Sequence, residues 1–227
     1  MRPDTSKDTL PAMRWFARKS VWLPTWQGWV VLVLALAGLG TLGMRTVHPF
    51  LAASKPVVAD VLAVEGWISM NGLEAARREF ETGGYRWLVV GGGPLPQGYL
   101  ISGFSTYAEI SGTALRKMGF PEKQLIVAPS APTFRNRTYE MIRGVRRALD
   151  ERGLAVSGVN VVTEGPHARR SAMVLHKVFG PMVPTGVISV TRQDYDPSRW
   201  WAASEGVKET LMETIAWSYE WLFSSGR

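Results

Sequence analysis

One imidazole and two guanidiniums stand close together directly after a strand-like run of apolar residues. His167, Arg169 and Arg170 follow residues 158–163, and they begin an apolar-periodic segment that reaches Phe179. The first turn of a helix presents free backbone N–H groups and the positive end of the helix dipole. Cations destabilise that end of an isolated helix, so the pattern indicates a negatively charged partner. We interpret the segment as an anion-binding ligand site, with a structural ion pair to a buried carboxylate as the alternative.

Two residues are candidates for proton transfer. Glu65 follows an apolar, β-branched run and precedes Gly66, a position that suits a general base. The alternative for Glu65 is a structural pair with Arg137 or Arg170. His167 suits a general acid or base, or a hydrogen-bond donor to an anion. Glu65 and His167 are therefore the predicted catalytic residues.

Two further groups belong to the predicted ligand site. Arg137 and Thr138 lie in the first turn of another predicted helix, which begins at Arg135, again with cations at its unfavourable end. The run Gly91-Gly92-Gly93 would let a backbone approach a phosphate, but it lacks the GxGxxG spacing of a dinucleotide-binding loop, and an ordinary turn is the alternative. The predicted ligand-binding residues are Gly66, Gly91, Gly92, Arg137, Thr138, Arg169 and Arg170.

No metal site is predicted. The chain has no cysteine and only three histidines, whose positions do not suggest a closed zinc set. A magnesium site made from Glu65, Asp194 and Asp196 is the remaining alternative. No cofactor is assigned from the sequence.

Alternating strand and helix signals must position these residues. The expected strands are 57–64, 87–90, 124–128, 158–163 and 186–190, and the expected helices are 71–80, 105–118, 135–152, 167–179 and 204–223. This order predicts an α/β fold, a Rossmann-like three-layer domain with a parallel sheet of about five strands and helices on both faces. In such sheets ligands bind at the carboxyl ends of the strands, where the candidate residues stand.

Two features of the predicted helices also bear on the arrangement. Asn71 is the expected cap of the helix through Phe80. The stripe Leu211, Ile215, Tyr219 and Leu222 predicts that the last helix turns an apolar face toward the core. Trp200 and Trp201 precede that helix, and they suit core packing, a stacking wall for a sugar or lipid headgroup, or contact with a membrane surface.

A long uncharged segment precedes the α/β pattern. No charged residue occurs from Ser20 to Met44, and this length and composition predict a membrane-spanning helix at residues 26–45. A cleaved signal peptide is the alternative, although its apolar region would be shorter. We predict a short cytoplasmic N-terminus at residues 1–25, a linker at 46–56 and an extracytoplasmic domain at 57–227.

The distribution of charge sets the orientation and excludes one class of partner. Five basic residues precede the span, whereas Arg45 and Lys55 follow it closely, so the positive-inside rule leaves the N-terminus in the cytoplasm. The formal net charge is +7, of which +4 lies in residues 1–45. The remaining residues carry 20 basic and 17 acidic side chains, which is nearly balanced. Nucleic acid is therefore not an expected partner.

Three motifs give the chain a family resemblance. Val64-Glu65-Gly66 and Gly91-Gly92-Gly93 correspond to two glycine-containing loops, and Thr163, His167 and Arg170 match a Thr-Ser-x-x-His-x-x-Arg motif. Residues 57–223 thereby resemble the envelope-protein family typified by SanA, ElyC and YdcF. In a further Asn-Thr-x-Glu-Asn motif, Arg137 and Met141 replace the asparagines, which indicates a divergent branch.

The resemblance implies a Rossmann-like domain tethered to the cell inner membrane, with a role in envelope integrity or envelope-polymer synthesis. We expect an inner-membrane protein that binds an anionic envelope intermediate carrying a phosphate or carboxylate group. One form of this prediction adds chemical processing of the bound intermediate. The alternatives are a non-catalytic envelope sensor or assembly factor, and a domain that binds a nucleotide-like cofactor such as S-adenosylmethionine.

Overall fold

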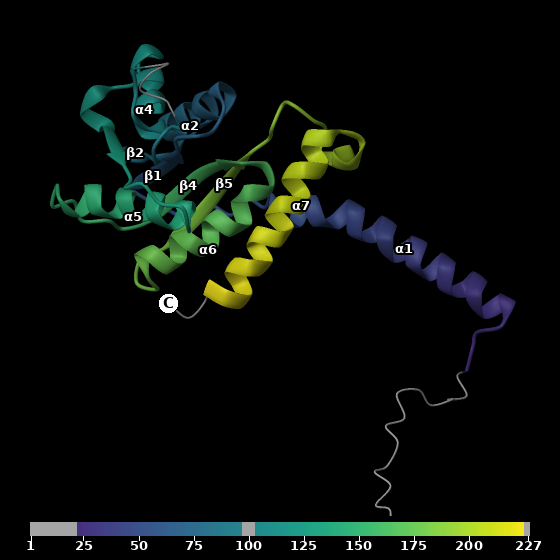
Figure 1. Ribbon diagram of the computed structural model, residues 1–227. Coiled ribbons are helices and arrows are strands. Elements are labelled where there is room, and N and C mark those ends of the chain that lie inside the picture. The colour runs from purple at the N-terminus through teal and green to yellow at the C-terminus, as the bar shows by residue number, and fades with distance from the viewer. Residues whose placement is uncertain (1–21, 97–102, 225–227) are drawn as a thin grey trace, which may run out of the picture. The chain divides into compact units, whose positions relative to one another are not determined.

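A five-stranded sheet with helices on both faces forms the body of the protein (Figure 1). The structure, a computed structural model, describes residues 22–96 and 103–224 of the 227-residue chain. The chain divides into two compact units, one ending at Gly40 and one beginning at Thr41. The second unit contains the whole sheet, and its parallel α/β architecture confirms the predicted fold class.

The sheet is entirely parallel and has the order β3-β2-β1-β4-β5. Its strands are β1 (Val61–Glu65), β2 (Trp87–Gly92), β3 (Leu125–Pro129), β4 (Val159–Glu164) and β5 (Thr185–Val190). The chain passes outward from β1 to β3, and then returns to place β4 on the other side of β1. The topological switch point, where doubly wound sheets bind their ligands, therefore lies between β1 and β4.

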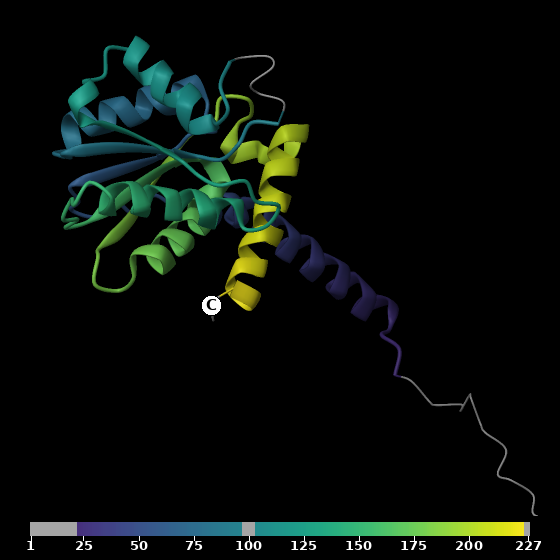
Figure 2. The same cartoon turned by 60° about the vertical axis from the view of Figure 1, so that its left-hand side comes forward.

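Helices cover the two faces in pairs, as Figures 1 and 2 show from two directions. The helices of this unit are α2 (Met70–Gly83), α4 (Tyr107–Lys117), α5 (Arg137–Asp150), α6 (Ala168–Phe179) and α7 (Ser204–Tyr219). Short 3₁₀ segments are η1 (Glu122–Gln124), η2 (Gly165–His167) and η3 (Pro197–Ala202), and a π turn, η4 (Glu220–Ser224), follows α7. Core contacts place α2 and α4 on one face of the sheet and α5 and α6 on the other.

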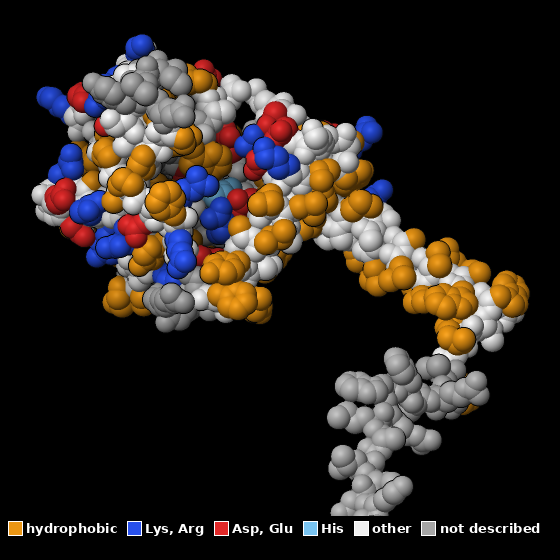
Figure 3. All heavy atoms as spheres, in the orientation of Figure 1, with side chains coloured by type: hydrophobic (Ala, Val, Ile, Leu, Met, Phe, Trp, Pro, Cys, Tyr) orange, Lys and Arg blue, Asp and Glu red, His pale blue; other side chains and the backbone are white. Residues whose placement is uncertain are grey.

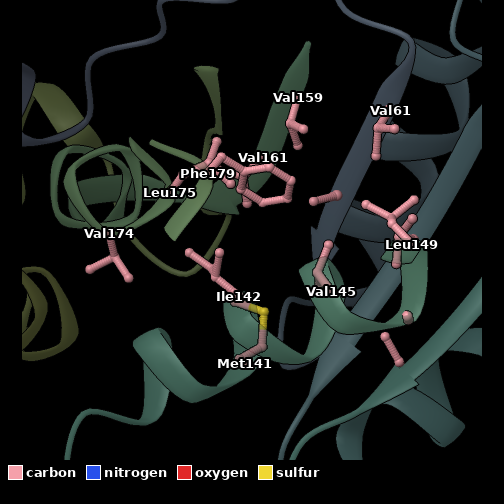
Figure 4. Close-up of a cluster of buried hydrophobic side chains, with 14 of the residues drawn as sticks. Val61, Met141, Ile142, Val145, Leu149, Val159, Val161, Val174, Leu175 and Phe179 are labelled. Carbon is pink, nitrogen blue, oxygen red and sulfur yellow. The ribbon is translucent and has the colours of Figure 1, made fainter. Parts of the chain in front are cut away.

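Strand β1 shows why the sheet is so apolar. Val61 and Ala63 pack into the core beneath α5 and α6, whereas Leu62 and Val64 pack into the core beneath α2 and α4. Successive side chains of a strand point to opposite faces, so a strand covered on both faces reads as a continuous apolar run. Figure 4 shows the α5–α6 core, in which side chains of β1 and β4 meet those of the two helices.

The N-terminus of α2 differs from the prediction. Ser69, rather than Asn71, caps this helix, and its hydroxyl accepts a hydrogen bond from the backbone N–H of Gly72. Serine and asparagine are both good caps. A tertiary contact distinguishes them here, because Glu164 at the end of β4 also accepts hydrogen bonds from the backbone N–H and the hydroxyl of Ser69.

Helix α1 (Trp26–Leu51) is long and apolar enough to cross a membrane, with a mean hydropathy of 1.9 in its most apolar window. Figure 3 shows apolar side chains along its surface. The helix continues past the predicted end of the span at residue 45, so the first part of the predicted linker is helical. Its last turns, from Thr41, belong to the same compact unit as the sheet, and Leu51 is buried there.

The prediction for the last helix was wrong about which face is buried. Helix α7 turns Gly206, Thr210 and Glu213 inward, and these are its buried residues. The stripe predicted to be core is instead exposed, by 50% at Leu211, 64% at Ile215, 58% at Tyr219 and 59% at Leu222. The apolar pattern of the helix was read correctly, but the sheet does not cover it.

Candidate functional site

Glu65 is a buried carboxylate at the carboxyl end of β1. Its side chain lies on the same face as those of Val61 and Ala63, which is the face covered by α6, and it has no solvent exposure. The hydroxyl of Thr163, near the end of β4, donates to Glu65 Oε2 at 2.6 Å. The hydroxyl of Ser171, in the first turn of α6, donates to Glu65 Oε1 at 2.7 Å. Both carboxylate oxygens are thus held across the topological switch point.

His167 lies between two carboxylates. It is the last residue of η2 and directly precedes α6, so the end of β4 determines its position. Its Nδ1 is 2.8 Å from Glu213 Oε1, and its Nε2 is 3.4 Å from Glu65 Oε2. The imidazole is 10% exposed, and Nε2 is buried without a well-formed hydrogen bond. Trp67 contacts the imidazole edge-on, with the ring centres 5.0 Å apart.

Arg170 forms a two-pronged ion pair with Glu213. Its Nε donates to Glu213 Oε2 at 2.9 Å and its Nη2 to Glu213 Oε1 at 2.8 Å, while Nη1 donates to Thr138 Oγ1 at 2.9 Å. Burial by itself raises the pKa of Glu213, but hydrogen bonds and charge from His167 and Arg170 outweigh it and lower the pKa to about 2. Burial likewise disfavours the charged guanidinium, but Glu213 outweighs it and raises the pKa of Arg170.

Glu65, His167, Arg170 and Glu213, which we name the switch-point cluster, combine two carboxylates, one imidazole and one guanidinium. Their charges balance when the imidazole is protonated. The side chains are nearly enclosed, with exposed fractions of 0% for Glu65 and 19% for Arg170. This buried arrangement holds the imidazole through Nδ1 and places its Nε2 3.4 Å from Glu65 Oε2, which makes these two groups the candidates for proton transfer.

The predicted cations are not all brought together. Arg169 stacks over the ring of Phe50, with its guanidinium carbon 3.7 Å from the ring centre, and its Nε donates to the Phe50 carbonyl at 2.6 Å. Arg137 is exposed at the first residue of α5, next to Thr138. Arg170 therefore binds other residues of the protein, and Arg169 packs on the last turns of α1. Arg137 lies at the surface, next to the Thr138 that Arg170 contacts.

The glycines of the predicted ligand site are explained by packing. A Cβ on Gly66 would lie 2.8 Å from the Gly91 carbonyl oxygen, and one on Gly91 would lie 2.6 Å from Met141 Sδ. A Cβ on Gly92 would lie 2.4 Å from the backbone nitrogen of Ala108. These positions let helices α4 and α5 approach the strand ends closely, so the glycines are needed whether or not a ligand binds.

Reasoning from the sequence missed Glu213, which is the centre of the charge cluster, and Ser171, which helps to hold Glu65. Ser171 had a usable signal, because it follows Arg170 in the first turn of a helix already assigned to the site. Glu213 had only a weak one. It occupies the same helical face as Gly206 and Thr210, a face of small and polar residues that the apolar stripe on the other side concealed.

A second buried carboxylate at the strand ends has a structural role. Glu164 points to the opposite face of the sheet from Thr163 and supports the N-terminus of α2 through Ser69. Negative charge is stabilising at that end of a helix. Its Oε2 also lies 3.8 Å from Arg192 Nη1. Glu164 is therefore accounted for by the fold.

The described residues, 22–96 and 103–224, contain no group of three or more histidine, cysteine, aspartate or glutamate side chains placed to hold a metal ion. The residues of the magnesium alternative are used elsewhere. Asp194 pairs with Arg192, Asp196 caps η3 through Ser198, and Glu65 accepts from two hydroxyls.

An open depression of about 450 Å³ lies along α5 and α6. Paired charges form much of its wall. Arg143 Nη1 lies 3.0 Å from Glu140 Oε1, and Arg146 Nε lies 3.2 Å from Asp150 Oδ2. These pairs neutralise Arg143 and Arg146, so the depression is a weaker candidate for an anion than the surface around Arg137.

No family model matches the chain, and no curated protein matches it either.

Proposed function

We propose that this protein is a membrane-anchored, extracytoplasmic protein that binds an anionic cell-envelope intermediate at the carboxyl ends of its strands. The anion is a phosphorylated or carboxylated group, as on a lipid-linked sugar. The proposal retains the resemblance to the SanA, ElyC and YdcF family, and it places the N-terminus in the cytoplasm by the positive-inside rule.

The position of the switch-point cluster carries this proposal. Ligands of doubly wound sheets bind outside the strand ends at the switch point, which lies here between Glu65 on β1 and His167 after β4. A buried imidazole nitrogen without a hydrogen-bond partner costs free energy, and a catalytic role is one explanation for such a group in a native structure. Ionisable groups with perturbed pKa values gather at functional sites, so a buried cluster in this place is a candidate functional site.

The start of α5 is the part of this site that supplies free positive charge. Asn136 precedes the helix with φ at 54°, and its side chain does not accept from the first N–H groups of the helix. Those groups and the exposed guanidinium of Arg137 suit an anion. The hydrogen bond from Arg170 to Thr138 connects this helix end to the cluster. An anion at Arg137 would therefore lie next to Thr138, the residue that Arg170 contacts, and we assign proton transfer to His167 and Glu65 within the cluster.

Calorimetric titration of the full chain in detergent tests the binding step, with inorganic phosphate and acetate as headgroup probes. Replacing Arg137 with glutamine removes a charge-assisted hydrogen bond worth roughly 1.5–3 kcal/mol. We therefore expect affinity to fall by about tenfold or more. Arg147→Gln is the matched control, because Arg147 is exposed ten residues further along α5, roughly 15 Å away. Equal affinities for both variants would contradict the assignment of Arg137.

A non-catalytic sensor or assembly factor is the second candidate, and the pairing within the cluster favours it. Arg170 and Glu213 bind each other through both carboxylate oxygens, and Glu65 is completely enclosed, as expected for a rigid structural core. Complementation of a strain lacking the gene distinguishes the two. Full complementation by both His167→Gln and Glu65→Gln would show that proton transfer is not required.

The S-adenosylmethionine alternative gains no support from the site. It depends on close approach of a cofactor to the glycines after β2, but Ala108 and Met141 occupy the space beside Gly92 and Gly91.

A further inference from the structure

An exposed apolar stripe runs along α7 and its π turn. It consists of five side chains, Leu211, Met212, Ile215, Tyr219 and Leu222, and we name it the α7 stripe. Each is exposed by between 50% and 64%. Figure 3 shows apolar side chains along this helix, in contrast to the mixed charges on the neighbouring surface of the same unit. Contiguous exposed apolar surface of this kind marks an interaction site.

The stripe is a consequence of how α7 is oriented. Its inward face is made of Gly206, Thr210 and Glu213, of which Glu213 is held by Arg170 and His167. Ile215 is two residues beyond Glu213, which at 3.6 residues per turn places it roughly 200° around the helix. The ion pair therefore holds the apolar side of α7 away from the sheet.

Contacts with the last turns of α1 connect this helix to the end of the candidate span. The indole nitrogen of Trp200, in η3, donates to the carbonyl of Met44 at 2.7 Å. Met44 is the last residue of the uncharged run. Trp217 of α7 contacts the ring of Phe50 edge-on, with the centres 5.1 Å apart. These contacts all lie within the unit that begins at Thr41.

The positions of those contacts along α1 give the distance between the contact with α7 and the end of the apolar run. Phe50 is six residues beyond Met44, which corresponds to roughly 9 Å along a helix. A helix with its side chains has a radius of about 5–6 Å, and interfacial helices lie about 5–10 Å deep in the headgroup boundary. If α1 spans the bilayer to Met44, α7 lies within reach of the headgroups.

Exposed aromatic side chains of α7 and of the segments η3 and η4 on either side of it fit the same environment. Trp201 is 37% exposed, Tyr219 58% and Trp221 57%. Tryptophan and tyrosine are enriched at the boundary between lipid and water, where an apolar ring and a polar atom are both accommodated.

We propose that the α7 stripe lies in the headgroup region of the membrane that α1 crosses, so that α7 is an interfacial helix and a second attachment of the domain. The proposal rests on the membrane anchoring in the proposed function. A lipid surface is favoured over a second copy of the chain because η3 and α7 contact the last turns of α1 through Trp200 and Trp217.

Depth-dependent quenching in vesicles tests this proposal. The chain has no cysteine, so single-cysteine variants of the full-length protein can be labelled with an environment-sensitive fluorophore. Ile215→Cys reports on the stripe, Leu34→Cys on the span, and Ala155→Cys on an exposed loop outside both. The vesicles contain phosphatidylethanolamine and phosphatidylglycerol, with a spin-labelled phosphatidylcholine as quencher.

We expect a blue-shifted emission and strong quenching at Ile215→Cys and at Leu34→Cys, and neither at Ala155→Cys. Quenching at Leu34→Cys without quenching at Ile215→Cys would overturn the proposal for α7 and leave the anchor intact. Absence of quenching at Leu34→Cys would instead refute the anchor itself. A blue shift at Ile215→Cys without lipid quenching, together with cross-linking between copies, would assign the stripe to a dimer and overturn the proposal.

Discussion

Replacing Glu213 with glutamine tests whether the switch-point cluster is the electrostatic centre of the domain. The substitution keeps the size of the side chain but removes its charge. Glu213 accepts hydrogen bonds from Nε and Nη2 of Arg170, and its Oε1 lies 2.8 Å from His167 Nδ1. The variant leaves a guanidinium that is only 19% exposed without its counter-charge.

Two independent estimates of the cost agree. The pKa of Glu213 falls from 4.5 to about 2 on folding, and at about 1.4 kcal/mol for each unit the carboxylate contributes about 3 kcal/mol above its unfolded pKa. Removing one partner of a buried ion pair costs about 3–5 kcal/mol in general. We therefore expect Glu213→Gln to lower the free energy of unfolding by about 3 kcal/mol, or the melting temperature by roughly 6–12 °C for a domain of this size.

Unfolding of the full chain in detergent, followed by circular dichroism, measures this cost. Glu205→Gln is the matched control, because Glu205 lies on the same helix in an exposed pair with Lys208 that contributes at most about 1 kcal/mol. A double variant, Arg170→Met with Glu213→Leu, should recover much of the lost stability, since the uncompensated charge is then absent. The reasoning is refuted if Glu213→Gln is no more destabilising than Glu205→Gln.

Three further predictions follow from particular residues. The contribution of Glu213 should be present above pH 4.5 and lost as the pH falls through 4.5 to about 2, so acid unfolding of Glu213→Gln should depend less on pH in that window. Gly92→Ala should destabilise the domain by roughly 1–3 kcal/mol, because the new Cβ would meet the backbone nitrogen of Ala108 at 2.4 Å. In Gly93→Ala, by contrast, the nearest atom is Ser130 Oγ at 3.4 Å, and denaturant melts of the two variants should differ accordingly. A cysteine at Ala155 should react with a membrane-impermeant maleimide in intact cells, whereas one at Ser6 should react only after lysis, and the reverse pattern would invert the proposed orientation.

The fold was predictable because its strongest signals are local. Strands covered on both faces appear as continuous apolar runs, and the helices between them end at glycines such as Gly84 and Gly119, both with positive φ. The cap of α2 was mispredicted because its choice depends on a carboxylate 95 residues away. Local preference alone ranks serine and asparagine equally.

The site was predictable in part, for a related reason. Glu65, His167 and Arg170 follow strands that a parallel sheet must bring to one edge, and the structure places them in one cluster. Glu213 lies 43 residues after Arg170 on a helix with no strand to position it. The buried carboxylate was foreseen as one alternative for the arginines, but its identity required the tertiary packing of α7.

The orientation of α7 links the buried site to the surface. Burying the five apolar residues of the α7 stripe against the sheet would be worth roughly 1.5–3 kcal/mol for each large side chain. Gly206 and Glu213 nevertheless lie on the inward face of α7. A Cβ on Gly206 would lie 2.3 Å from the Trp200 carbonyl oxygen, and Glu213 pairs with Arg170. Close backbone contact and a buried charge pair thus determine that the polar side of α7 faces inward. The apolar side stays exposed, so the free energy that its burial would contribute is not gained. A helix oriented in this way is stable in water only at a cost in exposed apolar surface, and the lipid boundary that we propose for α7 would remove that cost.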